Sequence, residues 1–260
     1  MIGIFGGSGF YSLLENAETK VVETPYGKPS SKIHIGRISG VDVAFIARHG
    51  ERHELPPHKI PYKANVYAFK ELGVDRIISP GAVGSLKADI RPGDFLVPDQ
   101  FAEFTHRDDT FYHGPKTVHI SSADPYCPEL RQLIIDECKA KKHRVHEKGT
   151  VVVIQGPRFA SRAESEFFRR NGWDIINMTM YPELILAREL EICYANIAIV
   201  TDYDTGLKED PSIKPVNIKD ALSVFKKNNE KIKRLIFDMV PRIPRERRCI
   251  CANAMEGAEI

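Results

Sequence analysis

The sequence predicts a single α/β domain, layered as α/β/α around a mixed central sheet. Apolar runs rich in β-branched residues recur along the 260 residues, and most are near-continuous, as in strands covered on both faces. Helical patterns alternate with the later runs. The segment from Gly27 to Gly50 instead favours two antiparallel strands around Ser39 and Gly40. The sheet is therefore expected to be mixed.

Each expected element follows from its local pattern. Strands are predicted over Ile2–Phe5, Lys32–Ile35, Val41–Ile46, Arg76–Ser79, Asp94–Val97, Gly149–Ile154, Asp174–Asn177 and Tyr194–Thr201. Helices are predicted over Ala64–Leu72, Pro128–Lys141, Ser161–Arg170, Tyr181–Leu190 and Asn217–Met239. No repeat or low-complexity linker divides the chain, so we expect one domain over residues 1–240 and a tail over residues 241–260.

The composition excludes several classes of function. Lys and Arg (37) balance Asp and Glu (35) at a net charge of +2 with no charged block, so nucleic acid is not an expected partner. No apolar run approaches the roughly 20 residues that span a bilayer, and the start MIGIFGG lacks the features of a signal peptide. A cytoplasmic protein without a membrane partner is expected. The scarcity of Gln and the many charged residues favour a heat-adapted source.

The five cysteines are too few and too irregular for a secreted disulfide scaffold, and no Cys/His cluster has zinc spacing, so no metal is predicted. Cys249 and Cys251 differ from the others because a thiol pair has little packing reason to lie in a polar tail. A strained CxC disulfide is one possibility, and a bridge from either cysteine to Cys138 or Cys193 is another. We expect this pair to serve heat stability or disulfide repair.

Three early segments could bind an anion or a flat ligand. GGSGF (residues 6–10) directly follows the first strand, and its glycines and the Ser8 hydroxyl suit an anion, although a tight turn is the simpler interpretation. ARHGERH (47–53) places four basic groups in six residues, which favours anion binding over pairing with nearby carboxylates. PGAVGS (80–85) is interpreted as small residues after a strand, where a ligand can approach the backbone.

Three later segments carry further candidates. Phe159, in a GPRF loop, could stack on an aromatic ligand, although a core aromatic is the simpler interpretation. Thr179 precedes a helix and could meet phosphate at the helix N-terminus or only cap the helix. Asp202 and Asp204 stand at i and i+2 on the end of an apolar strand, where carboxylates are costly to bury. They are candidates for acid/base work or ligand recognition, with a solvated turn as the alternative.

In their order and spacing these segments resemble the purine nucleoside phosphorylase superfamily, and within it the methylthioadenosine phosphorylases. The resemblance runs from Ile2 to about Phe237 and includes GGSGF, ARHGERH, PxKxxYxANxxAxKELG, GSL, PGD, DPYCP, GPRFASRAESxxFR, NMTxxPE and TDYD. It implies a nucleoside phosphorylase fold. It also implies phosphorolysis of 5′-methylthioadenosine to adenine and 5-methylthioribose 1-phosphate, with inorganic phosphate as co-substrate and no cofactor.

The resemblance also implies roles for individual residues. Phosphate would be bound by Ser8, Arg48, His49, Thr179 and the backbone of Ala82. The nucleoside would contact Met178 under the ribose, Phe159 against the purine, Asp202 and Asp204 at the base edge, and Ile218 and Ala221 around the methylthio group. His119 would reach the 5′ end of the nucleoside in a neighbouring subunit of a homotrimer or a dimer of trimers. Two features differ from the common pattern: Gly81 stands where relatives usually have a hydroxyl or Asn, and the CxC tail resembles some archaeal members.

The chemistry agrees with these roles. Departure of adenine builds positive charge on the ribose and negative charge on the base, so an anion beneath the sugar and a donor near N7 are both needed. Asp202, protonated or sharing a proton, would supply the donor, and Asp204 would face the exocyclic amine. A carboxylate accepts from an amino group, which favours 6-aminopurines. A broader phosphorylase acting on adenosine, inosine or guanosine remains an alternative. A dinucleotide-binding oxidoreductase or a non-catalytic nucleoside-binding protein would explain only the first glycine loop.

Overall fold

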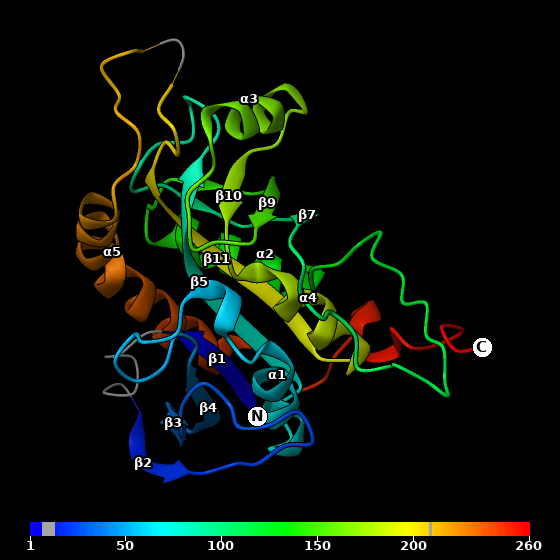
Figure 1. Cartoon of the computed structure of the whole chain (residues 1–260). Helices are drawn as coiled ribbons and strands as arrows, with labels where there is room; N and C mark the ends of the chain where they lie inside the picture. Colours follow the sequence, from blue (N-terminus) through cyan, green and yellow to red (C-terminus); the bar gives the residue numbers. More distant parts are fainter. Residues whose placement is uncertain (7–13, 208–209) are drawn as a thin grey trace.

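The computed structural model describes residues 1–6, 14–207 and 210–260, and its centre is an 11-stranded sheet (Figure 1). The strands are β1 (Ile2–Gly6), β2 (Glu15–Lys20), β3 (Ile33–Ile38), β4 (Val41–Ala47), β5 (Arg76–Ser85), β6 (Phe95–Leu96), β7 (Gln100–Phe104), β8 (Val145–His146), β9 (Thr150–Ile154), β10 (Ile175–Asn177) and β11 (Cys193–Asp202). Their order is β2-β3-β4-β1-β5-β10-β9-β7, with β11 paired to β5 and β6, and β8 paired to β6.

The sheet is mixed, as the sequence predicts. β5 pairs in parallel with β1 and with β11, and its far end pairs antiparallel with β10. β3 and β4 form the expected antiparallel hairpin, with Ser39 and Gly40 both at positive φ in its turn. Two consecutive residues at positive φ match the right-handed twist of the flanking strands, which favours this hairpin turn.

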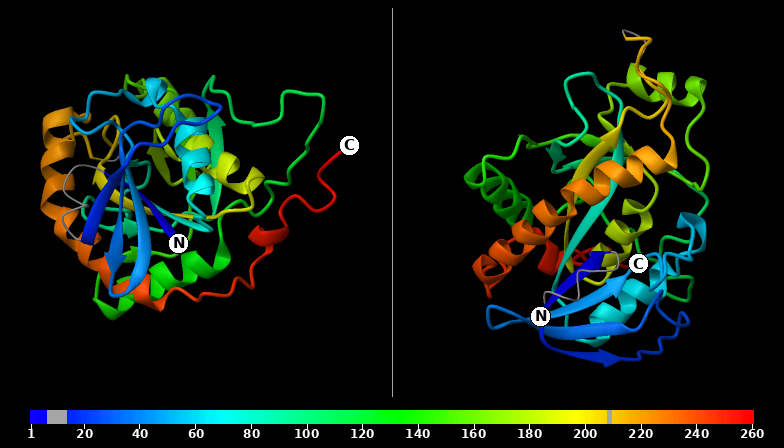
Figure 2. Two further views of the ribbon diagram at one scale, coloured as in Figure 1. Left: turned by 90° about the horizontal axis from the view of Figure 1, so that it is seen from below. Right: turned by 90° about the vertical axis from the view of Figure 1, so that its left-hand side faces the viewer.

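Helices cover both faces of the sheet, which confirms the α/β/α layering (Figure 2). The helices are α1 (Tyr62–Glu71), α2 (Pro128–Ala140), α3 (Arg162–Arg170), α4 (Met180–Glu189) and α5 (Ile218–Met239), with short 3-10 turns at Pro57–Lys59, Val240–Arg242 and Ile250–Asn253. α1 and α4 pack with Ile77 of β5 in one apolar cluster, and α2 and α5 pack with Ile78 in another. Successive residues of a strand point to opposite faces, so β5 contributes to both cores.

Two parts of the sheet differ from the sequence-based expectation. The strand predicted to end at Ser79 continues to Ser85, so the segment 80–85 is strand and not a loop. It continues because β11 pairs with it as far as Gly84. β2 and β7 escape prediction because each lies at an edge of the sheet, where polar residues are tolerated and apolar patterning is weak.

The C-terminal tail follows the surface of the domain and ends beside a distant loop (Figure 1). Val118 and Glu259 form an isolated antiparallel bridge, and the His119 N–H donates to the carbonyl of Ala258 at 2.8 Å. All five cysteines are free thiols, so the predicted CxC disulfide is not formed in the structure. No helix within the described residues is long and apolar enough to cross a membrane.

Candidate active site

Arg48 is the most tightly held of the predicted phosphate ligands. It follows β4, is 5% exposed, and lies against Glu183, a fully buried carboxylate of α4. The guanidinium Nε is 2.5 Å from Oε1 of Glu183, and Nη2 is 3.2 Å from Oε2. Burial opposes the positive charge, but the neighbouring carboxylate outweighs it, so the pKa of Arg48 is raised. Arg48 is therefore a permanent cation in a fixed orientation.

The remaining donors of Arg48 define what it can offer a ligand. Nη2 also donates to the Ser79 hydroxyl at 2.5 Å, and Nη1 donates to the carbonyl of Pro80 at 3.2 Å. A guanidinium carries five N–H bonds. Partners among the described residues account for four, so one Nη1 N–H is left for an incoming anion. Ser79 and Tyr194 in turn donate to Oε2 of Glu183, at 3.0 and 2.9 Å.

The neutral form of His49 is the one that could contact an anion. Its Nδ1 lies 2.9 Å from the carbonyl of Leu55, and its ring stacks on His53 with centroids 4.5 Å apart. Burial, followed by the charge of Arg48, lowers the pKa of His49 to about 4. A neutral imidazole bonded to a carbonyl must carry its proton on Nδ1. Nε2 is then an acceptor that suits a protonated phosphate oxygen.

Thr179 and Ala82 are joined by Asn177, a residue to which the sequence assigns no role. The Asn177 side-chain amide donates to the carbonyl of Ala82 at 2.9 Å. Its Oδ1 accepts from the N–H groups of Thr179 and Met180, at 2.6 and 2.8 Å, and lies 3.3 Å from the Thr179 hydroxyl. The Thr179 side chain makes no capping bond to α4, so the interpretation as a simple helix cap is wrong. Asn177 caps the helix in its place.

Asp202, which is half-buried, and Asp204, which is buried, form a carboxylate pair where β11 ends. Oδ1 of Asp202 accepts from the N–H of Asp204 at 2.8 Å, and Oδ2 accepts from the Thr201 hydroxyl at 2.7 Å. Asp204 is 2% exposed, and its Oδ2 has no partner among the described residues. Burial first, with the charge of Asp202 adding to it, raises the pKa of Asp204 to about 6. The interpretation as a solvated turn is therefore wrong.

Burial also raises the pKa of Asp202, although two hydrogen bonds oppose the shift. The absence of a side chain at Gly84 lets the pair lie close to β5. A Cβ there would be 3.0 Å from Oδ1 of Asp202 and 3.3 Å from Cβ of Asp204. The deeper carboxyl, Asp204, is the one that titrates closest to neutral pH.

Alternate residues of β5 bring these groups together. Pro80 contacts Arg48, Ala82 contacts Asn177, and Gly84 faces the two aspartates. The first two contacts are made by backbone carbonyls, the third by the bare Cα of Gly84, and four residues of a strand span roughly 13 Å. Arg48 therefore lies near one end of this stretch and the two aspartates near the other.

The residues predicted to contact the nucleoside differ in exposure and surroundings. Met178 lies against Gly156, where a Cβ would be 2.8 Å from the Met178 sulfur. Phe159 is 38% exposed, which removes the interpretation as a core aromatic. On the first turn of α5, Ile218 is 57% exposed and Ala221 is buried. Ser8 lies outside the described residues.

His119 is separate from this group. It lines a hollow of about 480 Å³ with the segment between Asp109 and Ile120. No predicted phosphate or base ligand lines that hollow. The structure of one chain therefore does not bring His119 to the carboxylate pair.

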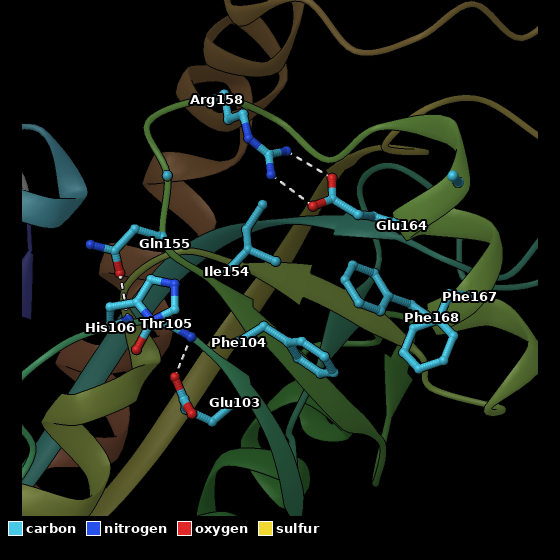
Figure 3. A pocket seen from close by; sticks show the side chains of 12 residues that line it. Glu103, Phe104, Thr105, His106, Ile154, Gln155, Arg158, Glu164, Phe167 and Phe168 are labelled. Atoms are coloured by element: carbon cyan, nitrogen blue, oxygen red, sulfur yellow. Dashed lines mark hydrogen bonds and ion pairs between the residues drawn. The ribbon is translucent and has the colours of Figure 1, made fainter.

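A larger hollow, of about 770 Å³, lies between the edge strand β7 and α3 (Figure 3). Arg158 and Glu164 form a two-bond ion pair, at 2.7 Å each, above Ile154. Phe104 and Phe167 line the hollow and are 42% and 52% exposed. None of the predicted site residues lines it. Its exposed aromatics suit a protein surface better than a small polar substrate.

Glu183 is the principal residue that the sequence does not identify as functional. It belongs to the NMTxxPE segment, but a Glu early in a helix is ordinarily explained by the helix dipole. The signal that could have identified Glu183 lies in its neighbours, because every residue of α4 from Met180 to Glu189 is buried. A carboxylate in such a helix needs a cationic partner.

Sequence comparisons place the chain among known enzymes. A family model described as Phosphorylase superfamily matches residues 1–241. The chain is 52% identical over 256 residues to a Pyrococcus furiosus protein named S-methyl-5′-thioadenosine phosphorylase, covering 98% of this chain and 97% of the relative. A Thermofilum pendens protein of the same name is 53% identical over 262 residues, covering 100% and 98%.

Solved structures agree with this placement. A methylthioadenosine phosphorylase from an antarctic soil metagenomic library superposes with a TM-score of 0.93 at 41% identity, covering 100% of this chain and 92% of that one. The Schistosoma mansoni methylthioadenosine phosphorylase in complex with adenine superposes with a TM-score of 0.91 at 35% identity, covering 98% and 96%. By sequence and by fold, the chain belongs to the phosphorylase superfamily.

Proposed function

We propose that the protein cleaves 5′-methylthioadenosine with inorganic phosphate, giving adenine and 5-methylthioribose 1-phosphate. The alignment along β5 carries the proposal. Arg48, with one free N–H, bonds to the carbonyl of Pro80, and the Asn177 amide bonds to that of Ala82. The carboxyl of Asp204, with a pKa of about 6, lies beside Gly84. An anion and a proton donor at opposite ends of one strand are what glycosidic cleavage by phosphate needs. The names of the relatives supply the nucleoside.

The reaction is a group transfer without redox change, so the proposal includes no cofactor. A phosphate oxygen supplies the electron pair for the new bond to C1′. The C1′–N9 bond breaks, its electron pair moves into the purine, and the purine takes a proton at N7. Arg48, His49 and Thr179 hold the phosphate, Ser8 remains a predicted ligand, and the aspartate pair holds the N7 proton.

The division of labour within the aspartate pair follows from burial. Asp204 has the carboxyl that is protonated up to a pH of about 6, and Asp202 is fixed by bonds from Thr201 and from the backbone. We therefore assign the shared proton to the pair rather than to Asp202 alone. A carboxylate beside the exocyclic amine accepts a hydrogen bond, whereas the carbonyl of a 6-oxopurine would repel it. This favours adenine as the leaving base.

Phosphate dependence tests the proposal. Adenine released from methylthioadenosine is measured with and without phosphate, using the Arg48→Ala variant as the inactive control. We expect adenine to appear only with phosphate and wild-type protein. Equal rates without phosphate, or no adenine under any condition, would overturn it.

A panel with adenosine, inosine and guanosine measures the breadth of specificity. The exposure of Ile218 leaves the 5′ side of the site open and favours some activity on adenosine. A Schistosoma mansoni relative is named adenosine/methylthioadenosine phosphorylase. Comparable rates on all four nucleosides would replace the specific function with that of a broad purine nucleoside phosphorylase.

We further propose that the active form is a homotrimer or a dimer of trimers in which His119 completes the site of a neighbour. His119 lies apart from the site of its own chain, and the exposed Phe104 and Phe167 offer an apolar surface at the sheet edge. Two inactive variants, His119→Ala and Arg48→Ala, are mixed, dissociated and reassembled. Because some hybrid sites would then contain both native residues, activity should return. Failure to regain activity, or a fully active monomer, would contradict this assembly.

A further inference from the structure

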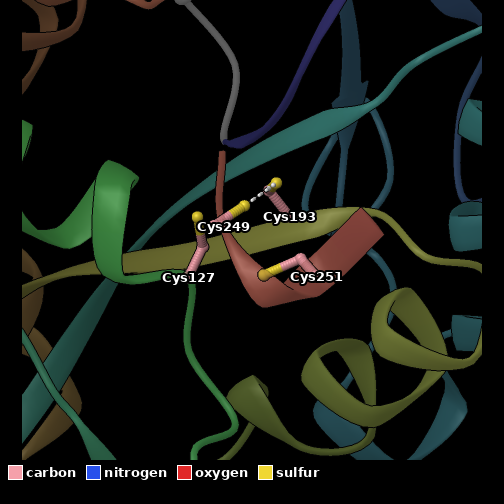
Figure 4. A group of neighbouring side chains, drawn as sticks. All are labelled: Cys127, Cys193, Cys249 and Cys251. Carbon is pink, nitrogen blue, oxygen red and sulfur yellow. Dashed lines mark hydrogen bonds between the residues drawn. The ribbon is translucent and has the colours of Figure 1, made fainter. Parts of the chain in front are cut away.

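Four cysteines from three parts of the chain meet behind the start of β11 (Figure 4). Cys127 precedes α2, Cys193 begins β11, and Cys249 and Cys251 belong to the tail. Their four sulfur atoms all lie within 4.8 Å of one another. The first two are far from the tail in sequence, so spacing along the chain does not reveal the group.

Hydrogen bonds that involve no thiol hold the tail at this place. Arg76, which is 1% exposed, donates to the carbonyl of Glu246 at 3.0 Å. Arg247 donates to the carbonyl of Glu191 at 2.5 Å, and the N–H of Arg248 donates to Glu129 at 2.8 Å. The N–H of Cys127 bonds to the carbonyl of Tyr194, which joins the α2 and β11 sides. The four thiols are thus brought together by the fold.

The separations suit a shared ion better than a sulfur–sulfur bond. The Sγ atoms of Cys193 and Cys249 are 3.4 Å apart, whereas the two sulfur atoms of a disulfide are about 2.0 Å apart. Four thiolates around Zn²⁺, each at about 2.3 Å in a tetrahedron, lie about 3.8 Å from one another. That value falls between the 3.4 Å pair and the 4.8 Å limit of the group.

We propose that Cys127, Cys193, Cys249 and Cys251 form a closed structural site for a soft divalent ion of the zinc type. One Zn²⁺ replaces the four thiol protons, leaving a [Zn(S-Cys)₄]²⁻ centre and releasing four protons to solvent. Four protein ligands leave no open position, so the ion holds the tail against α2 and β11 and takes no part in the reaction.

A buried cation leaves the sheet on the same face as Cys193. Arg76 is the direct register partner of Cys193 in the parallel β5–β11 ladder, and register partners project their side chains to the same face. The Nε of Arg76 is buried and has no hydrogen-bond partner among the described residues. The guanidinium also pairs with Asp75 and Glu129, at 3.4 and 3.7 Å, so its single positive charge offsets only part of the double negative charge of the centre.

Metal content of the full chain tests the site. The protein is produced with zinc, purified under reducing conditions and analysed for bound metal, and Co²⁺ is then exchanged in as a spectroscopic probe. We expect about one zinc per chain and thiolate-to-cobalt charge-transfer absorption. The double variant Cys249→Ser/Cys251→Ser should lose both signals and keep turnover at moderate temperature. Cys138→Ala, which removes a buried thiol outside the group, is the matched control and should keep one zinc.

Two results would overturn the site. One is less than a tenth of an equivalent of zinc in reduced, folded protein whose four thiols react when it is denatured. The other is a mass lower by two hydrogen atoms for each bridge, which would show disulfides among these cysteines under the same conditions. Because the wild-type turnover is measured alongside, failure of the metal site is distinguishable from failure of the proposed reaction.

Discussion

Glu183 holds the guanidinium of Arg48 with both carboxylate oxygens, at 2.5 Å from Nε and 3.2 Å from Nη2. The pair joins α4 to the end of β4 across residues that are 135 positions apart in sequence. Ser79 and Tyr194 bond to the same carboxylate. We therefore infer that Glu183 is a positioning residue, which fixes the N–H of Arg48 that stays free for the proposed phosphate.

Replacing Glu183 with Gln should separate two effects of Arg48, the orientation of its guanidinium and its electrostatic attraction for phosphate. The amide leaves the charge of Arg48 unpaired, so we expect kcat to fall about tenfold, equivalent to about 1.4 kcal/mol, because the guanidinium is no longer held. The KM for phosphate should fall, because the freed charge attracts the anion more strongly. Steady-state kinetics at varied phosphate measures both.

Glu183→Gln also breaks a buried ion pair, which typically costs about 3–5 kcal/mol of stability. Asp94→Asn is the control, because Asp94 is a buried carboxylate paired with Arg144 and His146 outside the site. It should lower the free energy of unfolding without changing the KM for phosphate. A higher KM for phosphate with unchanged kcat in Glu183→Gln would contradict the positioning role.

Asp202→Asn should change which base is preferred. The amide keeps the shape of the side chain but places an N–H where a carboxylate oxygen stood. Activity on 6-aminopurine nucleosides should fall, and the ratio of kcat/KM for inosine to that for adenosine should rise. Competition assays with the two nucleosides measure this ratio. If this ratio is the same in the variant and the wild type, Asp202 does not contribute to recognition of the base.

Asp204→Asn should stabilise the fold at neutral pH while it impairs turnover. The carboxyl has an ordinary pKa of 3.8 in the unfolded chain and about 6 in the fold, so the charged form is disfavoured by folding. The penalty develops as the pH rises from about 4 to about 6 and is complete above that. Two pKa units correspond to up to about 3 kcal/mol.

Thermal unfolding of Asp204→Asn and wild type is compared at pH 7.5 and at pH 3.5. We expect the variant to have the higher Tm at pH 7.5, and the difference to disappear at pH 3.5 because both side chains are then neutral. A variant that is less stable at pH 7.5 would show that the carboxylate is compensated in the fold.

Gly81→Ser should be accepted by the fold and should tighten phosphate binding. A Cβ at Gly81 would lie 3.7 Å from the Asn177 amide nitrogen and 3.9 Å from that of Asn196, which are ordinary contacts. Replacing a strand glycine also removes freedom from the unfolded chain, so stability should rise by about 0.5–1 kcal/mol. The new side chain lies beside the Asn177 amide that bonds to Ala82, so we expect it to add a hydroxyl near the proposed phosphate and the KM for phosphate to fall a fewfold.

Gly84→Ala is the contrasting substitution on the same strand. Its Cβ would be 2.9 Å from Ile176 and 3.0 Å from Oδ1 of Asp202, so the carboxylate pair must shift. We expect kcat to fall at least tenfold while the protein still folds. Similar kinetics in Gly81→Ser and Gly84→Ala would show that β5 does not align the two halves of the site.

The sequence by itself determined the layered fold and drew attention to the two groups of residues that make up the candidate site. Buried strands show as continuous apolar runs, and Arg48, His49, Asp202 and Asp204 are conspicuous because titratable groups at the ends of such runs are costly to bury in charged form. The edge strands β2 and β7 were hidden because exposed edges need no apolar pattern. Local signals therefore identify what is unusual along the chain.

Only the tertiary structure decided which distant residues meet. Glu183 becomes the partner of Arg48 because α4 is buried on every side, and Asn177 becomes a bridge because β10 ends beside Ala82. Cys127 and Cys193 join the tail thiols because α2, β11 and the tail converge at one place. The energies of such pairs depend on separation and burial in space, and neither quantity is written in the spacing of residues along a chain.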